Sequence, residues 1–147
     1  MNIIDRIKLW WYGIKGEVNK YGISARDIEK LVTKRMELDY FECLDGGYAV
    51  TDRETILKYL KFMPIAGQKY IGEDHDCENF AMEFQALAKR IFPRLAVGYV
   101  HISTPAGLHA ANIIFYMTDK GRLTYEFIEP QTNKLFMPQW DPYLLLV

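Results

Sequence analysis

One amphipathic helix, preceded by a strong start signal, is the feature that most constrains how this chain can fold. From Cys77 onward, apolar residues recur at helical spacing as far as residue 91, and Pro93 ends the pattern. Asp76 is a good N-cap residue directly before Cys77. A helix that carries one apolar stripe has to bury it against another element, so the sequence predicts a second layer.

The residues that follow predict that second layer to be a sheet. Three strand-like runs cover residues 95–103, 109–117 and 123–129. The turn at residues 119–121 joins the last two into an antiparallel hairpin, and both faces of this hairpin are largely apolar. A helix packed on a central antiparallel sheet gives an α+β fold.

The first part of the chain reads as mainly helical. Apolar residues at helical spacing predict an amphipathic helix over residues 3–21. Ser24 with Asp27, and Thr51 with Glu54, resemble capping boxes that open two more helices.

A turn at residues 45–47 predicts a short hairpin between those two helices. We therefore divide the chain into an N-terminal helical subdomain with a short hairpin, residues 1–63, and a core, residues 64–147.

Composition excludes several functional classes. The 147 residues are half hydrophobic, and 18 basic residues are balanced by 19 acidic ones, which disfavours nucleic-acid and anionic-membrane binding. No window approaches membrane-spanning length and the N-terminus does not resemble a signal peptide, so a cytoplasmic location is expected. Two cysteines are too few for a disulfide framework. The oligomeric state is left open.

The position of Cys77 suggests chemistry. The unpaired N–H groups and the dipole at a helix start stabilise a thiolate, and such a nucleophile needs an imidazole that a third group orients. His109 opens the first strand of the hairpin and Glu129 ends the second, so the two should be lateral neighbours. Glu126 faces the other way and is the weaker candidate.

Each of these residues also has a purely structural interpretation. A buried cysteine usually behaves as a small apolar residue, as we expect for Cys43. His101, within a strand, is expected to be a satisfied structural histidine, and His75 a solvated one. A carboxylate at a strand end is often a salt-bridge partner.

Three short segments add a resemblance. The segments D-C-E-N-F-A, L-H-A-A-N and F-I-E-P-Q-T-N are similar to motifs of the papain-like and transglutaminase-like cysteine proteases, most closely the papain-like protease domain of a fungal agglutinin and related phage and bacterial proteins. The resemblance covers about residues 70–140. It implies Cys77 as nucleophile, His109 as general base and acid, and Glu129 as orienting carboxylate. Leu108 departs from the motif, which has glycine there, and Glu78-Asn79 replace two aspartates.

The acidic residues around Cys77 oppose thiolate formation unless something compensates. They either cap the helix and face solvent, or they bind a hard cation such as Ca²⁺, for which Asp74, Asp76 and Glu78 are the candidate ligands. The resemblance implies Ca²⁺ as well, although no cofactor is required for the chemistry. An oxyanion hole would use the Cys77 N–H with a donor from Gln68 or Tyr70.

The leading hypothesis from the sequence is a cysteine hydrolase, a protease or amidase, that acts on a peptide or protein amide through a thioester, in the cytoplasm or in the host cytoplasm if phage-encoded. The alternative is a non-enzymatic phage- or host-interaction module that retains the fold. A winged DNA-binding unit has the right order of elements in its first part but lacks a basic face.

Overall fold

The computed structural model describes residues 4, 6, 18–72 and 75–147. Its helices are α3 (Ala25–Arg35), α4 (Arg53–Leu60) and α5 (Cys77–Ile91). Its strands are β1 (Tyr21–Ser24), β2 (Tyr40–Glu42), β3 (Gly47–Val50), β4 (Val97–Thr104), β5 (Gly107–Met117), β6 (Leu123–Glu129), β7 (Lys134–Phe136) and β8 (Pro142–Leu146). The predicted helix over residues 3–21 lies almost entirely outside the described residues.

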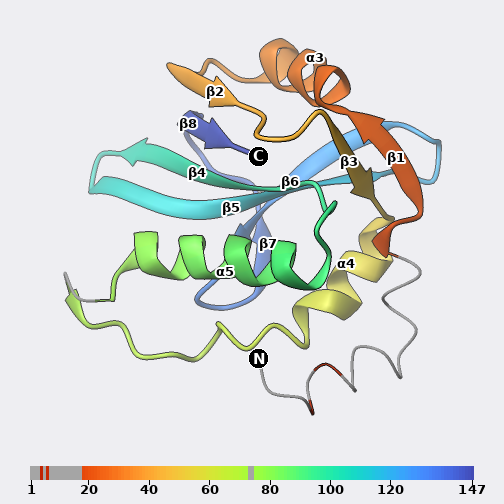
Figure 1. Cartoon of the computed structure of the whole chain (residues 1–147). Helices are drawn as coiled ribbons and strands as arrows, with labels where there is room; N and C mark the ends of the chain where they lie inside the picture. The colour runs from red at the N-terminus through yellow and green to blue at the C-terminus, as the bar shows by residue number, and fades with distance from the viewer. Residues whose placement is uncertain (1–3, 5, 7–17, 73–74) are drawn as a thin grey trace.

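A six-stranded sheet forms the centre of the molecule, in the order β2-β8-β4-β5-β6-β7. The strands pair antiparallel except for β2, which runs parallel to β8. A separate antiparallel pair joins β1 and β3. In Figure 1, α3 lies over one face of the sheet and α5 lies along the other, with α4 beside it. The predicted hairpin between residues 109 and 129 is confirmed as β5 and β6.

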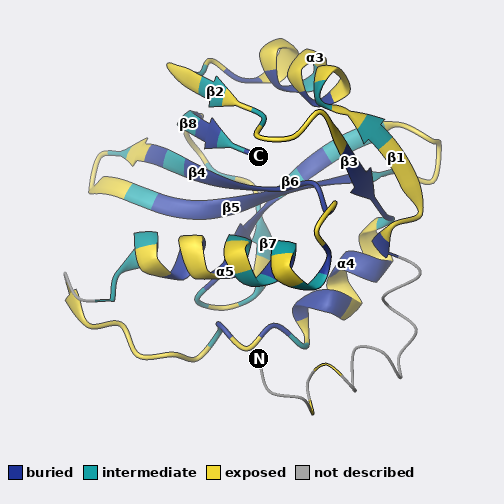
Figure 2. Ribbon diagram, viewed as in Figure 1, coloured by how far each residue is buried: buried dark blue, intermediate teal, exposed yellow. Residues whose placement is uncertain are grey.

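Side chains on the two faces of the sheet form two hydrophobic clusters, and the middle of the sheet is buried in Figure 2. On one face Phe80 and Phe84 of α5 are fully buried against strands β4 to β6. On the other, Ile28 and Val32 of α3 are fully buried. Full burial of one such side chain contributes about 1.5–3 kcal/mol. Both layers therefore hold the sheet in place.

Local signals determine where the helices begin. The Asp76 carboxylate accepts hydrogen bonds from the main-chain N–H groups of Glu78 and Asn79, and the Asn79 side chain accepts from the Asp76 N–H. Ser24 and Asp27 form the predicted capping box of α3. The predicted cap of α4 is wrong by one residue, because the N-cap is Asp52, whose carboxylate accepts from the Thr55 main-chain N–H.

The predicted fold class needs correction. A papain-like or transglutaminase-like α+β core with an N-terminal helical subdomain was expected, but among the described residues eight strands accompany only three short helices. The segment before residue 64 contributes β1, β2 and β3, and β2 belongs to the same sheet as the C-terminal strand β8. The domain boundary after residue 63 stays a prediction, and strands from both sides of it share one sheet.

The predicted hairpin around residues 45–47 is also wrong. The turn lies between β2 and β3, but the two strands do not pair with each other: β2 pairs with β8, and β3 pairs with β1. Each of the two strands pairs with a strand that is distant in the sequence, and a local sequence pattern does not reveal such pairing.

Candidate functional site

The thiol of Cys77 lies at the first residue of α5, beside strand β5. Its Sγ accepts a hydrogen bond from the Ala110 main-chain N–H, with 3.5 Å between nitrogen and sulfur. Around it lie Ala81 and Tyr99, together with Leu144 and Leu146 of β8. The thiol is half-buried, so it is supported by packing and is still accessible from solvent.

The sheet geometry explains why an N–H is available for the sulfur. The N–H of Phe115 points to the β4 side and donates to the carbonyl oxygen of Ala96, the residue before β4. Alternation therefore turns the N–H groups of even-numbered residues on β5 toward β6. The β5–β6 register would place Pro130 opposite Ala110, but β6 ends at Glu129. At Ala110, β6 no longer pairs with β5, so the Ala110 N–H is free of a strand partner and donates to Cys77 Sγ instead.

The residue before Ala110 is His109, whose ring is held by Glu129. The distance from His109 Nε2 to Glu129 Oε2 is 2.8 Å, and the two side chains are 33% and 24% exposed. The second carboxylate oxygen of Glu129 accepts from the Gln131 main-chain N–H. The carboxylate is fixed from both sides, so it holds the imidazole in one orientation.

The structure thus brings all three sequence-predicted residues to one end of β5. In the described residues the thiol is hydrogen-bonded to the Ala110 main chain and not to the His109 ring. Only Nε2 of the His109 ring is hydrogen-bonded, and Nδ1 has no hydrogen-bond partner among the residues that the structure describes. The arrangement provides a half-exposed sulfur, an oriented imidazole and a carboxylate for a ligand to contact.

The predicted metal ligands have separate roles where they are described. One oxygen of Asp76 caps α5, and Glu78 lies 3.4 Å from His101 Nε2. Asp74 lies outside the described residues. Within the described ranges, no group of three or more His, Cys, Asp or Glu side chains is arranged to hold a metal. The Ca²⁺ ion stays a prediction.

The predicted oxyanion donors lie in the loop before α5. Gln68 Oε1 is 3.1 Å from His75 Nε2, and its amide nitrogen is 3.5 Å from Glu83. Tyr70 is 53% exposed. Gln68 thus contacts its own loop and α5, and the oxyanion role of both residues stays a prediction.

Sequence reasoning missed a second group beside the thiol. His101 of β4 contacts the Tyr99 hydroxyl through Nε2 and the Tyr143 hydroxyl through Nδ1, the latter at 2.9 Å. The shared parity of Tyr99 and His101 on one strand was the only available signal. Tyr143 could not be found from the sequence, because it comes from β8, some forty residues further along the chain.

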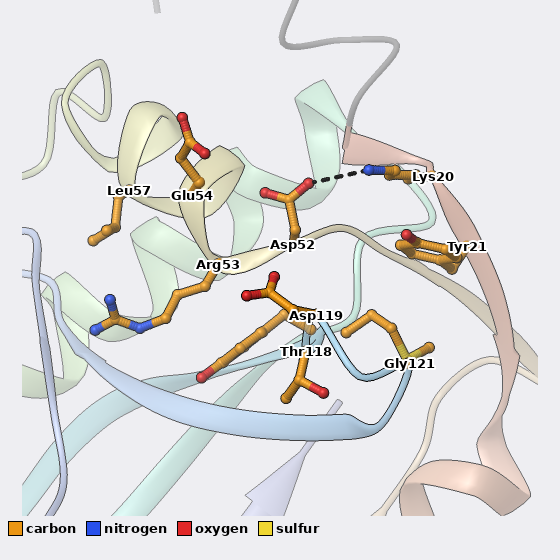
Figure 3. Close-up of a pocket in the computed structure, with 11 residues that line it drawn as sticks. Lys20, Tyr21, Asp52, Arg53, Glu54, Leu57, Thr118, Asp119 and Gly121 are labelled. Carbon is orange, nitrogen blue, oxygen red and sulfur yellow. Dashed lines mark hydrogen bonds and ion pairs between the residues drawn. The ribbon is translucent and has the colours of Figure 1, made fainter.

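A polar groove of about 750 Å³ lies at the other end of the β5–β6 hairpin, between that turn and α4 (Figure 3). Among its lining residues, Lys20 pairs with Asp52 at 3.5 Å, and Arg53 pairs with Glu126 of β6 at 2.6 Å. None of the predicted site residues lines it. The Arg53–Glu126 pair attaches α4 to the hairpin.

No helix among the described residues is long and apolar enough to cross a membrane.

No family model matches the chain, and no curated protein matches it. Several solved structures do match, among them the following two. One, titled as a PSL1a–E64 complex, is 22% identical with a TM-score of 0.70, and the match covers 86% of this chain and 51% of that one. The other, a lectin from Polyporus squamosus bound to the human-type influenza-binding epitope Neu5Aca2-6Galb1-4GlcNAc, is 22% identical with a TM-score of 0.67, covering 86% and 49%.

These matches concern the fold alone. This chain spans about half the length of each of the two solved chains. Its fold is therefore one that occurs within a larger protein named as a lectin.

That name contradicts what was predicted from the resemblance. A papain-like or transglutaminase-like cysteine protease was expected, with thiol-protease or amidase activity on a peptide or protein amide, and the second title instead names a lectin with an oligosaccharide epitope. The motifs around Cys77, His109 and Glu129 are short, and short motifs define a local arrangement more reliably than an activity.

Proposed function

We propose that this chain is a binding domain, and that its ligand site is formed by Cys77, His109 and Glu129 at the end of β5. One observation carries the proposal. The Ala110 N–H holds the sulfur at 3.5 Å, while the adjacent His109 is held by Glu129 at 2.8 Å. Three chemically active side chains from α5, β5 and β6 therefore lie together and partly exposed.

The composition of this site suits a small ligand. Binding sites combine an apolar lining with a few convergent polar groups that fix orientation. Here Ala81, Tyr99, Ala110 and two leucines of β8 provide the apolar lining, and the imidazole and carboxylate provide the polar groups. Both similar structures are named as complexes with a ligand, which supports a binding role for a chain with this fold.

The test is protection of Cys77 by E64, the compound named in the first of the two similar complexes. The full chain is incubated with E64 and then with iodoacetamide, and the labelling of each cysteine is followed by mass spectrometry. We expect E64 to suppress labelling of Cys77 and to leave Cys43 unaffected, so that Cys43 serves as the internal control. Unchanged labelling of Cys77 would remove E64 as a ligand of this site. Equal, slow labelling of both cysteines without E64 would contradict the site itself.

A second measurement separates binding from catalysis. The wild-type chain and its Cys77→Ser variant are incubated with casein and with small amide substrates. A binding domain leaves both substrates intact. Turnover that disappears in Cys77→Ser would contradict the proposal that the chain only binds.

An oligosaccharide is the second candidate ligand, because the second title names Neu5Aca2-6Galb1-4GlcNAc as the bound epitope. Titration of this trisaccharide into the chain, followed by calorimetry, tests it. Binding that persists in Cys77→Ser would place the sugar away from the thiol, and an absence of binding would assign the epitope to the half of the lectin that this chain does not match.

The predicted cytoplasmic location and the predicted Ca²⁺ ion stay predictions. A Ca²⁺ ion bound at the start of α5 stabilises the folded state by mass action. We therefore expect a higher Tm in millimolar CaCl₂ than in EDTA if the ion binds, and equal values if it does not.

A further inference from the structure

A hydrogen-bonded group of three aromatic side chains forms the other flank of the Cys77 site. Tyr99, His101 and Tyr143 lie with ring centroids 5.0 Å and 5.7 Å apart around the central histidine. Both ring nitrogens of His101 contact a tyrosine hydroxyl. A neutral imidazole has one donor and one acceptor, so one hydroxyl accepts from the ring and the other donates to it. The ring is therefore held in one orientation.

A β-bulge places Tyr143 in this group. The β4–β8 register pairs His101 with Leu144 and Ile102 with Pro142, so Tyr143 is the extra residue opposite the step between them. A bulge redirects a side chain from its regular position and often occurs beside functional sites. Here it brings the Tyr143 hydroxyl within 2.9 Å of His101 Nδ1.

His101 connects this aromatic group to the thiol site in two ways. His101 lies directly opposite Ala110, the residue whose N–H contacts the sulfur. Its Nε2 lies 3.4 Å from Glu78 Oε1, and Glu78 follows Cys77 in the first turn of α5. The His101 side chain is 18% exposed, while that of Glu78 is 45% exposed. The His101 ring is thus largely buried, whereas the Glu78 carboxylate that it contacts is exposed to solvent beside the thiol.

We propose that His101 is a positioning residue of the Cys77 site: held between two tyrosines, it fixes the Glu78 carboxylate beside the thiol and gives the site a preference for ligands with a positive charge. This inference rests on the proposed function. In the part of the chain that the structure describes, the Glu78 and Glu129 carboxylates each lie beside a histidine ring, and neither of them pairs with a lysine or an arginine. A cationic ligand group would find acceptors that no protein cation occupies.

Two thiol reagents of similar size and opposite charge test the preference. A trimethylammonium-ethyl and a sulfonato-ethyl methanethiosulfonate each form a mixed disulfide with Cys77 and release methanesulfinate. Rates are measured in EDTA on the full chain carrying Cys43→Ser, so that Cys77 is the only thiol. The readout is the ratio of the cationic rate to the anionic rate, compared with the same ratio for glutathione after correction for its net charge. We expect the ratio at Cys77 to exceed the reference ratio by roughly 3-fold or more, because one carboxylate near the surface attracts the cationic reagent and repels the anionic one.

The variants assign the effect to Glu78 and to the residue that holds it. Glu78→Gln should bring the ratio down to the reference, and Glu78→Asp should keep most of it. Tyr143→Phe removes the hydroxyl that orients His101 and should lower the ratio in part, with an unchanged rate for a neutral methanethiosulfonate. Glu83→Gln, which removes an exposed charge further along α5, is the matched control and should leave the ratio near the wild-type value.

Two outcomes would overturn the inference: a wild-type ratio equal to the reference, or an equal decrease in Glu78→Gln and Glu83→Gln. An unchanged ratio in Tyr143→Phe and in His101→Gln, both folded by circular dichroism, would remove the positioning role of His101. Failure of the proposed function looks different, because Cys77 would then react slowly with the neutral reagent as well.

Discussion

Asp76 shows how one residue determines the position of the thiol. Its carboxylate accepts two main-chain N–H groups of the first turn of α5, and the Asn79 side chain returns a bond to its own N–H. These contacts are local in the sequence, which is why Asp76 could be predicted as the cap. Cys77 follows directly, so the cap also determines where the sulfur enters the site.

Replacing Asp76 by Ala should therefore destabilise the chain by about 1 kcal/mol, the usual cost of losing an N-cap. Asp76→Asn retains an acceptor and should cost less. Urea unfolding followed by circular dichroism measures both. Equal stability of Asp76→Ala and the wild type would show that the carboxylate does not hold this helix start.

Residue-scale prediction succeeded where the chemistry was local or followed from one hairpin. The neighbouring positions of His109 and Glu129 came from the turn at residues 119–121. The Ala110 N–H on the sulfur could not be predicted, because it depends on where β6 stops. Tyr143 was missed for a similar reason, since its position depends on a bulge between β4 and β8.

At the scale of elements, close packing between strands limits what the sheet tolerates. A Cβ added at Gly98 of β4 would lie 2.7 Å from the Leu146 carbonyl oxygen and 2.9 Å from Ile113 Cγ2. The first contact is with main chain, which cannot move without disturbing β8. Glycine is therefore required where β4 is flanked by β5 and β8.

We expect Gly98→Ala to lower the free energy of unfolding by about 1–3 kcal/mol, as overpacking does. Gly46→Ala is the matched control, since a Cβ there meets nothing within 4 Å. Chemical denaturation of both variants measures the difference. A Gly98→Ala variant as stable as the control would contradict the packing of β4 against β8.

The contact between α4 and β6 predicts a pH dependence. The Arg53 guanidinium hydrogen-bonds to the Glu126 carboxylate, and this bond, opposed by burial, lowers the pKa of Glu126. A carboxyl whose pKa is lower in the folded state stabilises the fold above its unfolded pKa, about 4.3 for Glu, and this contribution is lost as pH falls through the folded pKa.

Glu126→Gln should therefore be less stable than the wild type at pH 7, and the difference should shrink as the pH is lowered below about 4. Urea titrations at a series of pH values provide the comparison, with Glu54→Gln as an exposed control on α4. A difference that stays constant down to acidic pH would mean that the ion pair does not contribute.

Elements with strong periodicity were predicted well, and pairing over long distances was not. Helix α5 and strands β4 to β6 match the predicted segments because their patterns are long and continuous. The short strands β2 and β3 were read as a hairpin, because the turn between them is visible in the sequence and their real partners, β8 and β1, are not.

On the scale of the whole molecule, both ends of the chain are needed to cover the sheet. Residues before position 51 provide α3, β1 and β3 on one face, where Tyr48 and Val50 are fully buried with Ile28 and Val32. Strand β2 pairs with β8 at one edge. Removing the first part would expose a broad apolar face.

We therefore expect residues 64–147 expressed alone to bind a hydrophobic dye and to unfold without a cooperative transition. The full chain should unfold in one step. Thermal and urea unfolding of the two proteins test this. A cooperatively folded 64–147 fragment would instead show that the predicted core is stable without the N-terminal part.

The most direct test of the account is the rate at which each cysteine reacts with iodoacetamide near pH 7. Cys77 lies half-buried at a helix start with an N–H on its sulfur, whereas burial raises the pKa of the Cys43 thiol. We predict that Cys77 reacts at least about tenfold faster than Cys43, because the raised pKa of Cys43 leaves less of that thiol as the reactive thiolate. Equal, slow reaction of the two thiols would contradict a ligand site at Cys77.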